Sequence, residues 1–483
     1  MTAAGALIRT IAIATLVGAG ALFSGTATEL GPPPVILLTV DTLRADHLSV
    51  YGYDRETSPR LAEFARDAVV FDRAYTTRTK TTPAYASMFT GLAPYRHGLR
   101  SLGERLPEEH VTLAELLGEA GYATAAFVSS TVMIGRLSAL DQGFDVYDDR
   151  LPQREANRTN YERIAEFTRA AAARWVARRP RRPFLFLHWI DPHGPYTPPA
   201  EFAGSFRTVD SPRIPSGKIP DFQRLGDERR LGAYVDAYDA EILYTDREMG
   251  RLIDTLRRYG LYDRSLIVFT ADHGESLGED GVYFRHGPTL HDAAARVPLL
   301  IKPPRASGPM RRYRGAVSVT DVFATVLDYA GLEVPGGTDA RSLRPVVEGA
   351  GGDESRVVFS EKEPGDPNRY AAHDRGGSLR AKGACRSVRG RLAPCDVAYF
   401  DAVADPEQRR RIGEGDAFRR LYDALAERRG AMTSFDQPYE VSRAYHPGDK
   451  EFVDVLIRAR NGGTDLQLDA EQFEALKRLG YIE

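Results

Sequence analysis

Three short apolar runs, each followed by acidic or imidazole side chains, constrain the fold of this chain most strongly. The runs are VILLTV (35–40), PFLFLHWI (183–190) and SLIVFTA (265–271). Continuous apolar runs of this length are typical of strands buried on both faces of a parallel sheet. The polar residues that follow them are Asp41, then Asp191 and His193, then Asp272 and His273. Because ligands of open α/β sheets bind outside the carboxyl ends of the strands, we expect one polar site there. The simpler alternative is that each Asp caps the next helix or turn.

Helical patterns lie between these runs. Ser58 and Pro59 supply a cap and a first-turn proline, and apolar residues then follow at helical spacing, at Leu61, Phe64, Ala65 and Ala68. A longer amphipathic stretch runs from about 231 to 259 and ends at Gly260. Strands that alternate with helices predict an α/β fold, a layered α/β/α domain over about 33–350. The remainder, 351–483, is richer in charge and predicts a smaller C-terminal α+β subdomain.

The N-terminal residues 1–28 predict export. Arg9 is the only charged residue before Glu29, and residues 10–28 form an apolar run rich in small residues. Such a run resembles a secretory signal, and it approaches the length of ~18 residues at which a membrane span can be argued. The sequence leaves open a cleaved signal peptide and a retained N-terminal membrane anchor, and the simpler alternative is a flexible leader. We expect a periplasmic or extracellular protein, near a membrane in the second case.

The two cysteines and the net charge restrict the compartment and the partners. Cys385 and Cys395 lie close together, so a disulfide could close a short loop in an oxidising compartment, and two free thiols are the alternative. The chain has 64 Lys+Arg and 67 Asp+Glu, a formal charge of −3. This charge provides no overall basic field for a nucleic-acid backbone. We therefore expect no nucleic-acid partner.

The segment TKTTPAYASMFTGLAPYRHG (79–98) carries a candidate nucleophile. Pro83 fits a first helical position and Thr82 the cap, so we expect Thr81 just outside a helix N-terminus. Unpaired N–H groups and the helix dipole stabilise a phosphate or sulfate at such a place. A threonine hydroxyl needs a base or a metal ion to become a nucleophile. The polar residues after the first and third apolar runs are suitable metal ligands, although a threonine before a helix is more often only a cap.

Five segments carry a pattern that extends over most of the chain. In order, they are VILLTVDTLRADHLSVYGY, TTPAYASMFTGLAPYRHG, DPHGPYTPP, VFTADHGESLGEDGVYFRHGPTLHDAAARVPLLIK and SVTDVFATVLDYAGLEVP. Over about residues 35–335 they resemble the landmarks of the sulfatase family in the alkaline phosphatase superfamily, and YFDAVADPEQ (399–408) is similar to the family's C-terminal signature. The resemblance implies an alkaline phosphatase-like three-layer α/β/α sandwich with a mostly parallel sheet and a smaller C-terminal α+β subdomain. It also implies a sulfatase-like ester hydrolase.

The nucleophile block departs from the family pattern. The family places a Cys or Ser there, which true sulfatases oxidise to formylglycine, and this chain has Thr81, whose extra methyl group blocks that chemistry. Tyr85 replaces the arginine that supports formylglycine. The strand ends read Asp41-Thr42 and Asp272-His273, where sulfatases generally have paired aspartates and an Asp-Asn pair. In these features the chain resembles the superfamily's phosphatases, phosphodiesterases and phosphoglycerol transferases, in which an unmodified Thr attacks phosphorus.

The resemblance also implies a ligand set and substrate contacts. One divalent metal ion, Mn²⁺, Zn²⁺, Mg²⁺ or Ca²⁺, is expected on Asp41, Thr81, Asp272 and His273. Further candidates are His193 and His286, as catalytic groups or ligands of a second metal, and Lys80 and Arg285, as substrate-binding cations. The alternatives are that His193 only orders its Pro-rich loop and that Lys80 and Arg285 are solvated charges. Structural roles are expected for His97, His188 and His291, and for a pair of Arg44 with Asp46.

Three functions remain open from the sequence. The preferred one is a metal-dependent hydrolase of a phosphate, phosphonate or sulfate ester, acting through a covalent intermediate on Thr81. The second is a transferase of the phosphoglycerol or phosphoethanolamine type, in which an alcohol takes the place of water. The third is a catalytically silent protein that binds a sulfated or phosphorylated glycan. The expected partner is thus a small-molecule, glycan-linked or lipid-linked ester.

Overall fold

The computed structural model describes residues 31–432, except for 155–160, 307, 363–368, 383–385, 389 and 394. The expected signal or anchor at 1–28 and Cys385, one of the two cysteines for which the sequence left a disulfide open, lie outside the described residues. Cys395 is disulfide-bonded. None of the described helices has both the length and the apolarity that crossing a membrane requires.

A nine-stranded sheet forms the centre of the described chain, with strand order β11-β2-β12-β8-β1-β7-β3-β4 and β13 beside β2. The three predicted strands are β1 (Val35–Val40), β7 (Pro183–Trp189) and β8 (Leu266–Ala271). β1 pairs in parallel with β7 on one side and β8 on the other, with Val40 level with Trp189 and Ala271. The residues that follow these three strands therefore meet at one edge of the sheet, as predicted.

The other strands make the sheet mixed at one side. They are β2 (Val69–Tyr75), β3 (Ala123–Phe127), β4 (Val146–Asp148), β11 (Arg296–Val297), β12 (Leu299–Lys302) and β13 (Arg311–Ser318). β3 and β4 continue the parallel part beyond β7, whereas β12 runs antiparallel to both β8 and β2. The sheet is thus mostly parallel.

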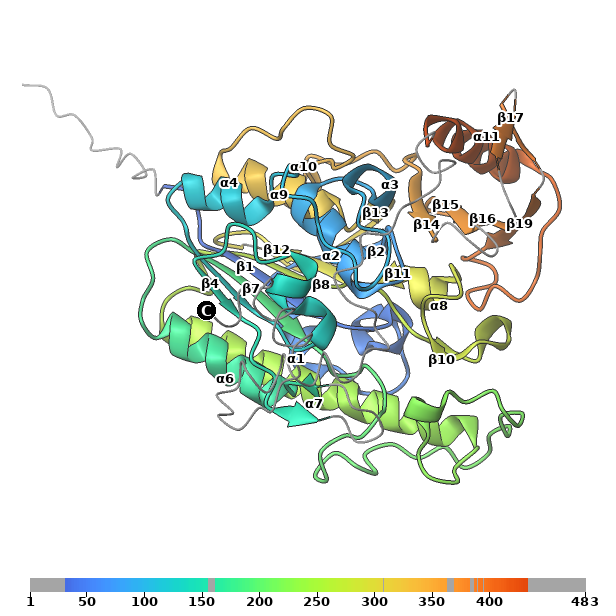
Figure 1. Ribbon diagram of the computed structural model, residues 1–483, viewed down its shortest axis with the longest axis horizontal. Coiled ribbons are helices and arrows are strands. Elements are labelled where there is room, and N and C mark those ends of the chain that lie inside the picture. Colours follow the sequence, from blue (N-terminus) through green and yellow to red (C-terminus); the bar gives the residue numbers. More distant parts are fainter. Residues whose placement is uncertain are drawn as a thin grey trace, which may run out of the picture. The chain divides into compact units, whose positions relative to one another are not determined.

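Helices cover both faces of the sheet (Figure 1). One face carries α1 (Pro59–Ala65), α6 (Ala165–Val176) and α7 (Leu231–Arg258), and the other carries α2 (Thr81–Thr90), α4 (Leu113–Glu119), α9 (Asp321–Ala330) and α10 (Arg344–Glu348). The predicted three-layer α/β/α architecture is confirmed, as is the long helix before Gly260. The predicted helix after Pro59 is shorter than expected: it ends at Ala65, because Val69 begins strand β2.

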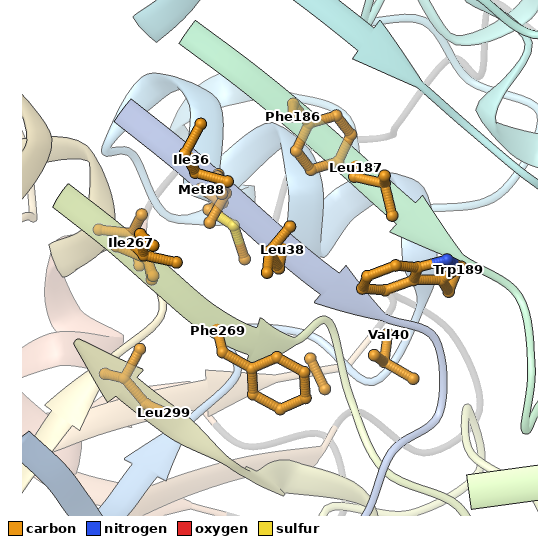
Figure 2. Close-up of a cluster of buried hydrophobic side chains, with 14 of the residues drawn as sticks. Ile36, Leu38, Val40, Met88, Phe186, Leu187, Trp189, Ile267, Phe269 and Leu299 are labelled. Atoms are coloured by element: carbon orange, nitrogen blue, oxygen red, sulfur yellow. The ribbon is translucent and has the colours of Figure 1, made fainter. Parts of the chain in front are cut away.

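Side chains of the three central strands form the core between the layers (Figure 2). Ile36, Leu38 and Val40 of β1 lie beside Phe269 of β8 and Trp189 of β7, and all of them are at most 4% exposed. Every residue of β1 is buried, so both of its faces contact apolar side chains. Such close packing leaves the strands little freedom, and the residues at their ends are held in fixed positions.

A four-stranded antiparallel sheet follows the sandwich. Its order is β14 (Val358–Glu361), β15 (Arg369–His373), β16 (Gly377–Lys382) and β19 (Asp396–Asp401). α11 (Asp416–Ala431) packs on it through a cluster that includes Leu379, Leu421 and Leu425. The architecture changes after α10 ends at Glu348, and the subdomain boundary at residue 350 stays a prediction.

His97 should make folding sensitive to acid. Its ring is fully buried, Nδ1 accepts a hydrogen bond from the Leu99 N–H (3.2 Å) and Nε2 lies 3.0 Å from Ser87 Oγ. Burial lowers the pKa of His97 from 6.5 to about 3. Folding thus favours the neutral ring, and this contribution, complete above pH 6.5, should fall by about 1.4 kcal/mol for each pH unit below it.

A denaturant titration at two pH values measures this loss. The His97→Gln variant removes the titrating ring, so the difference in unfolding free energy between wild type and variant should shrink by about 3 kcal/mol from pH 7 to pH 4.5. A difference that does not depend on pH would contradict the assignment.

Candidate active site

Two adjacent strands deliver three buried side chains to the carboxyl edge of the sheet. Asp41 follows β1, and Asp272 and His273 follow β8; each is at most 1% exposed. His273 Nε2 lies 3.2 Å from Asp272 Oδ2 and 3.8 Å from Asp41 Oδ1. One ligand atom from each of the three residues can be chosen so that all lie within 4.8 Å of one another. Residues about 230 positions apart therefore converge as the sequence predicts.

Thr81 joins this cluster from the N-terminus of α2. Its hydroxyl oxygen lies 3.4 Å from His273 Nε2, and the residue is 4% exposed. The helix begins two residues earlier than predicted, because the Ala84 N–H bonds to the Lys80 carbonyl. Thr81 is thus the first helical residue and not the residue outside. Pro83 costs no hydrogen bond there, since the first N–H groups of a helix have no intrahelical acceptor.

The electrostatics of the cluster fit a cation. Burial and the negative charge of Asp41 raise the pKa of Asp272 to about 7, and burial lowers the pKa of His273 to about 4. Asp272 Oδ1 accepts hydrogen bonds from the N–H groups of Thr42 (3.3 Å) and His273 (2.8 Å), whereas the buried Oδ2 accepts none from the described residues. A divalent cation would offset the repulsion between the two carboxylates and use a neutral imidazole, so these residues fit a metal.

His188 lies beside this set, although the sequence reasoning assigned it a structural role. It is fully buried in β7, and its Nε2 is 3.5 Å from Asp41 Oδ2. The Ser129 N–H donates to His188 Nδ1 (3.3 Å), so Nε2 carries the proton and faces Asp41. His188 thus orients a candidate ligand. The signal that could have revealed it is a histidine inside an otherwise apolar strand.

His286 and His193 lie near His273. The His273 and His286 rings stack with centroids 4.2 Å apart, and the His193 ring is 5.7 Å from that of His286. His193 Nδ1 donates to the Gly194 carbonyl (2.8 Å), so this ring also orders its own loop. The fully buried Glu275 was not predicted: its Oε1 lies 3.4 Å from His286 Nδ1. Its place two residues after His273, shortly after a buried strand, was the available signal.

The two candidate cations differ in position. The Lys80 side chain passes so close to Gly287 that a Cβ atom there would lie 3.1 Å from Lys80 Cε, and Lys80 Nζ is 3.4 Å from Ser101 Oγ. Lys80 therefore lies next to the segment that carries His286. Arg285 is exposed in β10 (Tyr283–Arg285), and its substrate contact stays a prediction.

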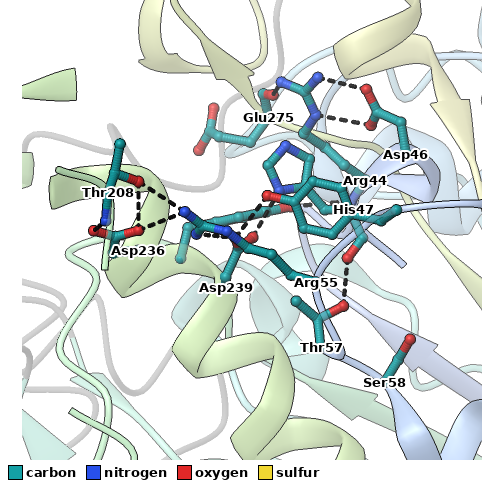
Figure 3. Close-up of polar contacts among 12 residues, drawn as sticks. Arg44, Asp46, His47, Arg55, Thr57, Ser58, Thr208, Asp236, Asp239 and Glu275 are labelled. Atoms are coloured by element: carbon teal, nitrogen blue, oxygen red, sulfur yellow. Dashed lines mark hydrogen bonds and ion pairs between the residues drawn. The ribbon is translucent and has the colours of Figure 1, made fainter. Parts of the chain in front are cut away.

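Ion pairs and a hydrogen bond to the buried Asp239 tie the loop after β1 to α7 (Figure 3). Arg44 forms the predicted pair with Asp46 (2.7 Å), and it also bonds to the Glu275 carbonyl (3.1 Å). Asp239 of α7 accepts from His47, Tyr53 and Arg55, each at 2.7 Å. These contacts hold the backbone that follows Asp41.

Thr42, directly after Asp41, has a backbone that a β-branched residue rarely adopts. Its φ is +54°, in the left-handed region. The Tyr238 hydroxyl donates to the Thr42 carbonyl (2.7 Å) and accepts from the Arg44 N–H (3.0 Å), which stabilises this turn. Backbone strain of this kind concentrates at functional sites.

The remaining polar candidates have local roles. Asp191 accepts the Ala165 N–H at the start of α6 (2.8 Å), so it caps a helix, but the one that precedes β7 and not the next one along the chain. His97 links α2 to the turn after it, as described above. His291 Nδ1 accepts from the Ala293 N–H (3.0 Å), and its Nε2 donates to the Glu407 carbonyl (3.2 Å). The structural roles expected for His97 and His291 are confirmed.

Comparisons with known proteins agree with this architecture. Residues 33–332 match the family model described as Sulfatase. An arylsulfatase of Clostridium perfringens is 22% identical over 462 residues, 81% of this chain and 92% of the relative. A choline-sulfatase of Rhizobium meliloti is 27% identical over 478 residues, 86% of this chain and 90% of the relative. The crystal structure of a phosphonate monoester hydrolase of Agrobacterium radiobacter aligns with a TM-score of 0.67 at 20% identity, over 83% of this chain and 95% of that one.

Proposed function

Because the chain belongs to the sulfatase family of the alkaline phosphatase superfamily, we propose that it is a metal-dependent hydrolase of phosphate, phosphonate or sulfate esters with Thr81 as its nucleophile. One observation carries the proposal: the Thr81 hydroxyl oxygen lies 3.4 Å from His273 Nε2, next to two buried carboxylates. A threonine that only capped a helix would not need to lie beside a histidine and two buried carboxylates. The same contact argues against a catalytically silent glycan-binding protein.

The ester class is proposed from the nucleophile. Arylsulfatase, choline-sulfatase and phosphonate monoester hydrolase are among the relatives and neighbours of this chain. Thr81 cannot be oxidised to the aldehyde that sulfatases use. Phosphate and sulfate groups are both tetrahedral, so a site that binds a sulfate ester can also position a phosphorus ester for attack by the Thr81 alkoxide. We therefore place phosphate and phosphonate esters ahead of sulfate esters.

Each residue of the site has a role in the proposed hydrolysis. Asp41, Thr81, Asp272 and His273 would hold a divalent ion, which supplies Lewis acidity that lowers the pKa of a hydroxyl and neutralises charge on an ester oxygen. The N–H groups and dipole at the start of α2 stabilise the anionic ester, with Lys80 as a second positive charge. Thr81 releases its hydroxyl proton to solvent and its Oγ forms a bond to phosphorus as the bond to the leaving oxygen breaks, while His193 or His286 supplies the proton that this oxygen needs. Water then attacks phosphorus, the bond from phosphorus to Thr81 Oγ breaks, and a proton from the water restores the threonine hydroxyl.

We also propose that the protein is exported. The apolar run at 10–28 supports this, and so does the disulfide-bonded Cys395, because disulfides persist in oxidising compartments. Whether the N-terminal run is cleaved or retained as an anchor decides between a periplasmic or extracellular enzyme and a membrane-bound one.

A panel of aryl esters tests the function. We expect purified protein to hydrolyse phosphate monoesters, phosphodiesters or phosphonates with a higher kcat/KM than the matching sulfate, and to lose turnover with a chelator. Glycerol added as an acceptor should leave free phosphate or phosphonate as the main product. A glycerol ester as the main product would establish the transferase. No turnover, with tight binding of a sulfated oligosaccharide, would establish the binding protein.

A further inference from the structure

A dense group of arginines lies at the edge of the sheet opposite the candidate active site. The sequence RWVARRPRRP (174–183) joins α6 to β7, and no acidic residue occurs between Glu166 and Asp191. The end of α7 and the turn before β8 add two more arginines. We call these exposed residues the arginine cluster: Arg174, Arg178, Arg179, Arg181, Arg258 and Arg264.

The members of the arginine cluster come from neighbouring elements. α6 and α7 pack on each other on one face of the sheet (Figure 1). The Arg179 guanidinium lies 5.9 Å from the ring of Tyr259, which follows Arg258 at the end of α7. β8 begins directly beside the start of β1, with Val35 level with Leu266, so Arg264 lies at the same edge. Three exposed acids lie at this edge, Glu119 at the end of α4, Asp145 before β4 and Asp263 before β8, against the six cations of the cluster.

The six guanidinium groups have no anionic partner within the described part of the chain. None of the six guanidinium groups of the cluster forms a hydrogen bond or an ion pair with a described residue. Arg182, which follows Arg181, does: it donates to the Ala120 carbonyl (3.1 Å). Helix C-termini favour cations, but only Arg174 and Arg258 lie inside a helix. Arg179 has a φ of +53°, where a glycine or asparagine would be less strained. A turn that served only to connect α6 to β7 would not need this residue.

The predicted apolar segment leads into β1 at the edge of the sheet that carries the arginine cluster. β1 and β7 are parallel neighbours, with Val35 level with Phe184, so β1 begins beside the end of RWVARRPRRP. Only residues 29–34 separate the apolar run at 10–28 from β1. Six residues span at most ~22 Å when fully extended, so a segment that enters a membrane would keep this edge close to the membrane surface.

We propose that the arginine cluster binds the anionic surface of a phospholipid membrane. Each arginine near such a surface gains about 1 kcal/mol, roughly a fivefold increase in partitioning. β1 leads from this edge to Asp41 over six residues, which at about 3.3 Å each place the candidate active site ~20 Å further from the lipid. The site then faces the aqueous phase, and its substrates reach it from water.

Vesicle sedimentation of the purified full chain tests the proposal. Partitioning onto phosphatidylcholine vesicles measures the contribution of the N-terminal segment, and the increase on adding phosphatidylglycerol measures the contribution of charge. We expect Arg178→Gln/Arg179→Gln/Arg181→Gln to lower that increase by roughly 100-fold, with unchanged partitioning onto phosphatidylcholine alone. The matched control, Arg207→Gln/Arg213→Gln/Arg410→Gln, removes three exposed arginines elsewhere and should keep the wild-type increase.

Salt provides a second measurement that needs no variant. Molar salt should abolish the preference of the wild-type chain for phosphatidylglycerol, because the Debye length falls to ~3 Å. The proposal is overturned if the wild-type chain partitions equally onto both vesicles, or if the two triple variants lose the preference equally. Binding of the cluster to a soluble polyanion, with no preference for phosphatidylglycerol vesicles, would also overturn it.

Discussion

Replacing Thr81 by alanine should lower kcat/KM by about 10⁴-fold or more, because it removes the proposed nucleophile. The side chain is almost fully buried, so the change leaves a small cavity and a folded protein. The conservative Thr81→Ser variant keeps the hydroxyl and should retain activity within about tenfold. Steady-state kinetics on the best aryl ester of each variant measure both effects.

Two controls make this result specific to the nucleophile. The melting temperature of Thr81→Ala should stay close to that of the wild type, and intact-mass measurement of acid-quenched wild-type protein should show the mass of a phosphoryl or phosphonyl adduct that Thr81→Ala lacks. Thr82→Ala is a matched variant, since its hydroxyl is equally buried on the next residue and forms no hydrogen bond among the described residues. Equal losses in Thr81→Ala and Thr82→Ala would rule out the covalent mechanism.

Under the proposed mechanism, removing divalent metal ions should have a comparable effect. Dialysis against a chelator should lower turnover by about 10³-fold or more, and Mn²⁺ or Zn²⁺ should restore it. Asp272→Asn keeps the size of the side chain and removes one of two adjacent buried carboxylates, so it should prevent this restoration. A direct binding measurement is the rise of the melting temperature with added metal, since a ligand at 1,000 times its dissociation constant stabilises the native state by about 4 kcal/mol.

The same titration separates a ligand from a structural carboxylate. Asp191→Asn alters a strand-end aspartate that caps α6, so it should lower the melting temperature without changing the metal-dependent rise. Asp272→Asn relieves the repulsion with Asp41, and its apo form should therefore be at least as stable as the wild type. Chelator-insensitive turnover, or an undiminished metal-dependent rise in Asp272→Asn, would refute the proposed ligand set.

The central strands and the convergence of the site were predictable because buried parallel strands have a simple pattern. The runs VILLTV and SLIVFTA have the pattern of buried strands. Once these strands are parallel neighbours, Asp41 and Asp272 must lie at the same edge of the sheet. The resemblance of the ordered motifs placed Thr81 in the same site. None of these inferences required knowledge of a side-chain conformation.

The features that the sequence did not reveal depend on tertiary contacts. Val69 and Val70 continue a helical spacing, yet they form β2 because β12 and β13 offer backbone partners there. The start of α2 depends on one hydrogen bond to the Lys80 carbonyl, and propensity favoured a later start at Pro83. The contact of His188 with Asp41 arises between strands far apart in the chain, and that of Glu275 with His286 depends on how the segment between them folds, so a local pattern can mark these residues but not their partners.

The attachment of the loop after β1 to α7 matters to anyone who wishes to redesign this enzyme. Asp239 accepts from three side chains of that loop and is itself fully buried, so altering the loop risks displacing Asp41 from its neighbours. The turns between residues 200 and 230 carry many exposed side chains and follow β7 at the same edge of the sheet. Libraries that aim to broaden specificity should therefore diversify those turns and leave residues 41–58 untouched.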